Sequence, residues 1–380
     1  MSNVFNLVSE ETYIEQTDKL AVYLAAIAAK GDGTLRPTSW SDVQSIVRNG
    51  LASKVFAIGD QLTCQRDGVN LVWDVIGIDH DTPADPQFTH SMTLQLHDCF
   101  PTNMQFDADE AFYYAENGLA AGTYHFVVSD TSYQFTLDNA VPVGGQLFLN
   151  WSANTPTSIS VCATVGGATE GSSISVTQGA QGTALGTITD DGDFTNNINS
   201  LARARYGSDN YKESAIRQWL NSSASAGSVW TPQTNYDRPP LWASDMEGFL
   251  NGLDADFLAV VGNTHIVTSR NGICEDGVDE STDDKFFLLS RREVFAGDER
   301  QVVTEGEPYP HYSDYSDLNE AGIGNDSNRI KYKNGTAQVW MLRTPYNISA
   351  MSFRHVSVAG NVSSGNAKNN YGVVPACNII

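Results

Sequence analysis

The sequence WMLRTPYNISAMSFRHVSVAGNVSSGNAKNNYGVVPA, from Trp340 to Ala376, joins two stiff apolar ends by a long polar middle. The first end, WMLRTP, alternates along the chain and predicts a strand that ends at Pro345. In the other end, GVVPA, Gly372 and Pro375 fix the return of the chain. Residues 346–371 are rich in Asn, Ser, Tyr, His and Arg. The whole stretch therefore predicts a rigid frame that carries a polar surface segment.

Two kinds of residue occur within that segment. Val356, Gly360, Val362 and Ala367 are small or β-branched and suit a strand and a tight turn. The others contact ligands well, because Tyr gives contact area at low entropic cost and Asn and Ser give adaptable hydrogen bonds. We expect the ligand-binding residues to be Tyr346, Asn347, Ser349, Ser352, Arg354, His355, Ser357, Asn361, Ser363, Asn366, Asn369, Asn370 and Tyr371.

Length and composition indicate a folded, β-rich protein of more than one unit. The chain has 380 residues, of which 41% are hydrophobic, 18% are charged and 32 are Gly. These values predict two or three units with formed cores and many turns. The net charge of −23 repels phosphate backbones and anionic lipids, so we expect no nucleic-acid partner.

The cysteines and the apolar segments bear on the compartment. Five cysteines are scattered without a CxxC pair, and their odd number argues against a closed disulfide framework, so we expect buried thiols. We find no signal-peptide pattern and no run of about 20 apolar residues, and expect no membrane insertion. Folding in a cytoplasm follows, with later export as part of a larger particle.

The chain divides into four expected regions. Residues 1–38 contain a helix over 9–30 for oligomerisation or attachment, with an apolar stripe on one face. Residues 39–120 begin a larger domain, and residues 121–190 form an inserted antiparallel β subdomain of short Gly-, Thr- and Ser-rich strands. Residues 191–380 complete the larger domain and carry the polar surface segment.

Local patterns in 39–120 predict particular elements. Ser41 caps a short helix, and Arg66-Asp67-Gly68 makes the turn of a β-hairpin. A third strand covers HSMTLQLHD. The segment FDADEAFYYAENG, residues 106–118, has acids at its start and Gly118 at its end, which predicts a short helix.

Catalytic and metal-binding motifs are missing. The sequence contains no GxGxxG before a helix, no GxxxxGK[ST], no HExxH and no GxSxG, and suggests no cofactor. The acids of 273–284 lack the spacing of a calcium loop, so a solvated loop is favoured over a cation site. Asp79-His80-Asp81 with His90 and His97 matches no metal-ligand pattern, and loop histidines that bond their surroundings are the favoured interpretation.

Three stretches resemble a known family. They are YKESAIRQWLNS (211–222), KFFLLSRREV (285–294) and WMLRTP with GVVPA (340–376). They are similar to the hallmark segments of a C-type-lectin-fold family of bacterial and phage genomes, several members of which are variable proteins of diversity-generating retroelements. The resemblance covers most of 195–380 and, more weakly, 40–118. It implies an α+β protein with a C-type lectin fold, a β insertion and an N-terminal helix.

The hallmark segments also have a physical explanation. Ile216, Trp219 and Leu220 lie three and four residues apart, so one helix face enters the core while Arg217 and Gln218 stay outside. The run FFLL, Phe286 to Leu289, is apolar throughout, which predicts a short strand buried on both faces.

The genetic code adds a link to the retroelement role. Adenine-directed mutagenesis of an AAC codon yields Asn, Ser, Tyr, His and Arg, and each expected ligand-binding residue is of such a type. Met351 and Lys368 are not, and would have to be fixed. An ordinary polar loop, common in Asn- and Ser-rich sequences, is the alternative.

The resemblance implies a binding protein and no enzyme. We expect a diversified ligand-binding protein of a phage or prophage, on the virion surface, which recognises a host-surface protein or glycan. Other virion proteins would be partners, and a homo-oligomer, for which we favour a trimer, would add avidity.

Two alternatives stay open. One is a structural decoration protein of the virion without a specific ligand. The other is an oxidase of the formylglycine-generating type, which shares the fold and depends on a reactive cysteine pair. Cys274 and Cys377 are the cysteines in the matching half and have no motif around them, and copper bound by the two thiols would favour this alternative.

Overall fold

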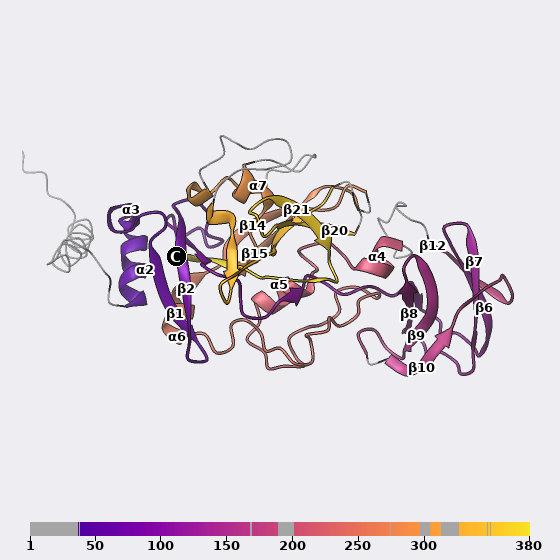
Figure 1. Cartoon of the computed structure of the whole chain (residues 1–380). Coiled ribbons are helices and arrows are strands. Elements are labelled where there is room, and N and C mark those ends of the chain that lie inside the picture. Colours follow the sequence, from indigo (N-terminus) through magenta and orange to yellow (C-terminus); the bar gives the residue numbers. More distant parts are fainter. Residues whose placement is uncertain are drawn as a thin grey trace, which may run out of the picture.

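A computed structural model gives a mostly β protein with a few short helices and several antiparallel sheets (Figure 1). It describes residues 37, 39–167, 169–188, 201–273, 275–296, 305–312, 327–347, 349 and 351–380. The helix expected over 9–30 lies outside these residues. Within them, no helix has the length and apolar character needed to cross a membrane.

One six-stranded sheet organises the larger part of the chain, with all its pairs antiparallel. Its order is β1-β2-β3-β23-β13, and β16 also pairs with β23. The strands are β1 (Gln61–Arg66), β2 (Val69–Ile78), β3 (Met92–Leu96), β13 (Val261–Gly262), β16 (Phe286–Phe287) and β23 (Ala376–Ile379). The expected hairpin turn joins β1 to β2, with Asp67 and Gly68 both at positive φ, as a tight two-residue turn requires.

The helices are short, and all but α4, which packs on the second cluster of strands described below, lie around this sheet and its loops (Figure 1). The first, α2, begins after Ser39, whose hydroxyl accepts a hydrogen bond of 3.1 Å from the Asp42 amide. The prediction of Ser41 as the cap was therefore wrong by two residues. The helices are α2 (Trp40–Arg48), α3 (Ala52–Val55), α4 (Leu201–Tyr206), α5 (Ala215–Leu220), α6 (Ala255–Val260) and α7 (Arg291–Phe295), with 3-10 turns η1 (Pro310–Tyr312) and η2 (Ser327–Arg329).

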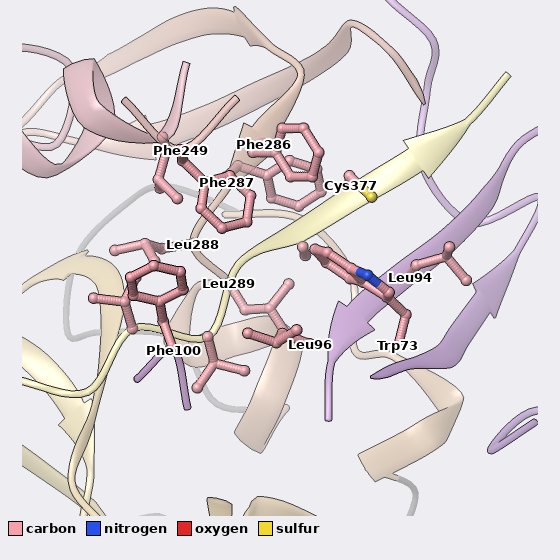
Figure 2. Close-up of a cluster of buried hydrophobic side chains, with 14 of the residues drawn as sticks. Trp73, Leu94, Leu96, Phe100, Phe249, Phe286, Phe287, Leu288, Leu289 and Cys377 are labelled. Atoms are coloured by element: carbon pink, nitrogen blue, oxygen red, sulfur yellow. The ribbon is translucent and has the colours of Figure 1, made fainter. Parts of the chain in front are cut away.

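The main core lies where β16 and β23 meet the helices (Figure 2). Phe286, Phe287, Leu288 and Leu289 are all fully buried, so the prediction of a strand-like run buried on both faces is confirmed. The ring of Phe286 lies 5.0 Å from Phe249 and 6.0 Å from Trp73. Burial of side chains of this size contributes about 2–3 kcal/mol each. The apolar run thus anchors β23, which carries the chain's last residues.

Buried ion pairs tie the hallmark segments together. Arg343 on β19 (Trp340–Pro345) bonds Glu293 on α7 through both guanidinium nitrogens, at 2.6 and 2.7 Å. Arg217 on α5 bonds Asp284, at 2.7–3.0 Å. Arg217 was expected outside, and instead only part of its side chain is exposed. The three segments that are distant in sequence therefore form one contiguous structure.

A two-sheet β sandwich lies at the end of the molecule opposite α2 and β1 (Figure 1). Its sheets have the orders β10-β9-β8-β5 and β11-β7-β6-β12, and a separate hydrophobic cluster that includes Phe126 and Phe135 fills it. All its pairs are antiparallel except β12 with β6. The strands are β5 (Tyr113–Ala115), β6 (Gly122–Val128), β7 (Thr131–Leu137), β8 (Gly145–Ser152), β9 (Thr155–Cys162), β10 (Thr169–Ser175), β11 (Thr177–Gln178) and β12 (Thr183–Ile188).

The prediction of a helix over 106–118 was wrong. That segment contains strand β5, which pairs with β8, and Phe112 and Ala115 enter the sandwich core. Pairing with β8 provides partners for the backbone N–H and C=O groups of this segment, which in a helix would have bonded one another. Just before it, the Glu110 amide donates to the Arg203 carbonyl at 3.1 Å, so the chain enters and leaves the sandwich at one place.

The remaining strands form small sheets around the main one. They are β4 (Met104–Gln105), β14 (Thr264–Ser269), β15 (Asp279–Asp284), β17 (Lys331–Lys333), β18 (Thr336–Gln338), β20 (Ser352–Val356), β21 (Val362–Asn366) and β22 (Asn370–Tyr371). Five of the thirteen expected ligand-binding residues lie on the sheet β19-β20-β21 and five more in the turns that connect its strands. Strand β22 pairs with β4 and carries Asn370 and Tyr371.

Candidate ligand-binding surface

The sheet β19-β20-β21 fixes the backbone of the polar segment. Trp340 and Leu342 on β19 are fully buried, as are Phe353 and Val356 on β20. The ring of Phe353 stacks on Phe106 at 4.5 Å. Buried apolar side chains thus anchor the chain before the segment, on β19, and within it, on β20.

The strand register divides the expected residues between two faces. Ser352 lies opposite Asn366, and Arg354 lies opposite Ser364. The next pair, His355 with Ser363, points to the other face, because successive side chains of a strand alternate. The expected ligand-binding residues therefore do not share one face of the sheet.

The first face carries a cation–π pair. The guanidinium carbon of Arg354 lies 3.8 Å from the centre of the Tyr346 ring. The Ser352 hydroxyl donates to the Asn366 side-chain oxygen at 3.2 Å and lies 3.4 Å from the Ser349 hydroxyl. A planar guanidinium held on an aromatic ring is pre-organised for polar recognition, since less entropy is lost when it binds.

The second face packs around Tyr371. Its ring centre lies 5.2 Å from that of His355 and 5.6 Å from that of Phe353. A side chain at Gly365 would lie 2.2 Å from the Tyr371 hydroxyl, so glycine makes room for the tyrosine. Burial, followed by the nearby Arg354 charge, lowers the pKa of His355 to about 4, and the imidazole is neutral near pH 7.

Exposure separates the expected residues into three groups. Asn369 and Asn370 are exposed, and nine others, among them Tyr346 and Arg354, are half-buried. Ser352 and His355 were expected at the surface, but each is only 7% exposed. Pairing with β21 covers the Ser352 side chain, and Tyr371 covers His355. These two side chains therefore lie beneath the surface residues and are not part of the surface themselves.

A buried asparagine outside the expected set supports the segment. The Asn271 side-chain amide donates to the Ser349 carbonyl at 2.9 Å and to the Tyr346 carbonyl at 3.4 Å. The same nitrogen donates to the Asp209 carboxylate at 2.7 Å. Sequence reasoning missed Asn271, because a single Asn in a loop gives no periodic or motif signal.

The acidic segment 273–284 is only in part the solvated loop that was expected, with Asp276, Asp279 and Asp283 exposed. Its second half forms β15, and Asp284 is buried against Arg217. Glu275 lies 3.6 Å from Arg203, and 12% of its side chain is exposed. Arginines that are far away in sequence bring these acids inside, which composition alone does not reveal.

The histidines of the β2–β3 region bond separate aspartates. His80 bonds Asp81 and His90 bonds Asp79, each at 3.0 Å. His97 bonds Asp74 on β2, at 2.9 Å. Asp81 also accepts from Thr93, Asn378 and Tyr309, which fixes the loop against the last strand. These pairs join neighbouring segments and do not converge on a common point.

The cysteines of the described residues are buried thiols that form no disulfide with one another. Burial raises the pKa of the Cys377 thiol well above its usual value, and the side chain has no exposed surface. A protonated, inaccessible thiol is a poor nucleophile and metal ligand. Cys274, the other cysteine of the oxidase alternative, lies outside the described residues.

Two cavities lie away from the sheet β19-β20-β21. One, of about 520 Å³, is lined by Asp74, His97 and Lys331 among others. The second, of about 460 Å³, lies between α2 and the chain end at Ile380. Neither of these two cavities is lined by any residue of 340–371.

Comparison with known proteins gives one family. A family model described as a domain of unknown function (DUF6273) matches residues 189–380, which is just over half of the chain. No curated protein matched, and no solved structure matched. The matched region contains the three hallmark segments and the sheet β19-β20-β21.

Proposed function

We propose that this chain, which belongs to the DUF6273 family, is a ligand-binding protein whose binding surface is formed by residues 346–371. The observation that carries the proposal is the division between buried anchors and accessible polar side chains within one short segment. Phe353 and Val356 are fully buried, whereas Asn369 and Asn370 are exposed and Tyr346 is half-buried.

This division suits recognition more than catalysis. Tyrosine, arginine and asparagine side chains supply contact area and adaptable hydrogen bonds, the properties of paratopes. Arg354 is held on Tyr346, and truncation of such an Arg or Tyr typically costs a binding site more than 1 kcal/mol. Replacement of the exposed side chains leaves the anchors untouched, so the surface tolerates variation.

The proposed context is that of the family the sequence resembles. We place the chain among the C-type-lectin-fold variable proteins of phages and prophages, displayed on the virion and binding a host-surface protein or glycan. Residues 1–38 and the β subdomain of 121–190 would attach it to other virion proteins or to sister subunits. A homo-oligomer, for which we favour a trimer, raises overall affinity through avidity.

Binding to intact bacteria tests the recognition role. The fluorescently labelled chain is incubated with a panel of bacterial strains, and bound protein is measured by flow cytometry. We expect the double variant Y346A/R354A to bind a positive strain at least tenfold more weakly than the parent, a loss of about 1.4 kcal/mol. The matched control T136A, an exposed change in the sandwich, should bind as the parent does. Equal binding by Y346A/R354A, or no binding to any strain, would favour a decoration protein.

Natural variation tests the retroelement role separately. The gene is sequenced across many isolates, and substitutions are compared between adenine-bearing codons and all others. Diversification of the surface predicts changes concentrated at exposed positions such as Asn369 and Asn370, with Phe353 and Val356 unchanged. Uniform substitution along the chain would contradict this role. A near-copy of the gene's 3′ end beside a reverse transcriptase gene would support it directly.

A further inference from the structure

Arg203 on α4 faces more carboxylates than it can neutralise. Its guanidinium lies 3.1 Å from Glu110, 3.6 Å from Glu275 and 3.9 Å from Glu213. Asp209, which is 2% exposed, lies in the same cluster. The Arg203 guanidinium therefore meets up to four negative charges, three of them on largely buried side chains, whereas 41% of the Glu213 side chain is exposed.

The surroundings of this cluster compensate its negative charge only in part, since the Asn271 amide and Arg203 lower the pKa of Asp209 less than burial and Glu275 raise it. Burial raises the pKa of Asp209 well above its usual value, and the charge of Glu275 raises it further. Burial also raises the pKa of Glu110 to about 7, against the opposing effect of Arg203. The charged and titratable groups that face the cluster from neighbouring segments are Asp107, Lys212, Asp237, Arg270 and Glu280.

The cluster is connected directly to the candidate binding surface. Asn271, which is fully buried, uses one amide nitrogen to bond Asp209 and the carbonyls of Tyr346 and Ser349. These carbonyls form the turn between β19 and β20, where the Tyr346 amide donates to the Ser352 carbonyl at 2.7 Å. Displacement of Asp209 therefore displaces the support of this turn.

A packing contact provides a second connection. Ala202, next to Arg203 on α4, is buried against Ile273 and Met351. Ile273 follows Asn271 in the loop that holds Glu275, and Met351 lies in the β19–β20 turn region. A shift of α4 or of this loop is thus transmitted to the turn by both packing and hydrogen bonding.

We propose that the carboxylates around Arg203 are a pH-sensitive support, which orders the Tyr346–Ser349 turn when they are protonated and loosens it when they ionise. The inference rests on the proposed function, because it concerns regulation of the same surface. It predicts a better-ordered surface, and tighter binding, under mildly acidic conditions.

The sign follows from proton linkage. For Glu110 and Asp209 the folded pKa lies above the unfolded value, so each group favours the ordered state fully below its unfolded pKa. That contribution is lost as the pH rises through the folded pKa, which for Glu110 is about 7. Above this point the ionised carboxylates repel each other, and opening the loop towards water relieves the repulsion.

Hydrogen exchange of the free protein tests the inference without any ligand. Amide protection of a peptide that covers the Tyr346–Ser349 turn is measured at pH 6 and pH 8, corrected for intrinsic exchange, with EDTA present so that no divalent cation replaces protons. We consider one carboxylate whose pKa is near 7 while the loop is closed and ordinary once the loop has opened. Proton linkage then predicts that amide protection falls approximately tenfold between pH 6 and pH 8. Asp209→Asn should remove most of this fall, because it keeps an acceptor for Asn271 without the charge.

Matched variants separate this effect from general destabilisation. Asp276→Asn changes an acid of the same loop that pairs with Arg270, and should keep the fall in protection. Glu110→Gln, on a different segment, should reduce the fall as Asp209→Asn does. Equal protection of the parent at both pH values, or an unchanged fall in both neutralising variants, would overturn the inference. Because no ligand is involved, this result is independent of binding to bacteria.

Discussion

Removal of Arg343 should destabilise the main core severely. Its guanidinium makes two bonds to Glu293 and one of 2.8 Å to the Leu288 carbonyl, with only 1% of its side chain exposed. Arg343→Met keeps most of the volume but leaves a buried carboxylate without its cation. Loss of one partner of a buried pair costs about 3–5 kcal/mol, and the orphaned Leu288 carbonyl adds ~1 kcal/mol. We expect the free energy of unfolding to fall by about 4–6 kcal/mol.

Urea unfolding followed by tryptophan fluorescence measures this loss, because Trp219 and Trp340 are buried in the same core. The double variant Arg343→Met/Glu293→Leu removes both charges, so it should recover much of the loss. Lys333→Met changes a half-buried cation bonded to Asn103, and should cost under ~1 kcal/mol. A loss below about 1 kcal/mol in Arg343→Met, or no recovery in the double variant, would refute the assignment of this pair as an essential link.

Three further outcomes are expected. Gly372→Ala should lower the free energy of unfolding by about 1–3 kcal/mol in urea titrations, because its Cβ would lie 2.8 Å from the Val339 carbonyl oxygen; unchanged stability would contradict this. His355 has a folded pKa of about 4, below its unfolded value of 6.5, so its contribution is complete above pH 6.5 and is lost as the pH falls towards 4. His355→Gln should therefore lose less stability than the parent between pH 7 and pH 4.5, and an equal loss would count against the burial of this ring. Phe126→Ala should lower the free energy of unfolding of the sandwich by about 3–5 kcal/mol, which speeds hydrogen exchange in β6 and β7 but not in β16. The control Thr136→Ala should change neither stability nor exchange. Equal acceleration in β16 would show that the two cores unfold together.

Sequence patterns were informative where the order of neighbouring residues determines the local structure. The run from Phe286 to Leu289 could be recognised as buried because apolarity on every position leaves no solvent face. The β1–β2 turn could be recognised because Asp67 and Gly68 accept positive φ with little strain. The framework residues Val356 and Ala367 of the polar segment, recognised by their small or β-branched side chains, are likewise fully buried, whereas Phe353 was missed.

Sequence patterns failed where distant partners decide structure. The acids of 273–284 resemble a solvated loop until Arg203 and Arg217 are placed beside them. Ser352 and His355 are of surface type, but cross-strand pairing and the Tyr371 ring cover them. The local sequence does not indicate strand register or ion pairs between distant residues. For this reason part of the expected surface was found in the interior.

The connection of the sandwich to the larger part has an evolutionary consequence. The Glu110 amide bonds the Arg203 carbonyl where the chain departs and comes back, and Gln146 on β8 bonds the Asn235 and Asp237 carbonyls nearby. When an insertion begins and ends at one place, the segments of the surrounding domain on its two sides stay next to each other. Such an insertion therefore disturbs that domain little. Exchange of the sandwich by recombination at this point would therefore interrupt no strand of the six-stranded sheet, but it would remove contacts such as that of Arg238 with Phe148.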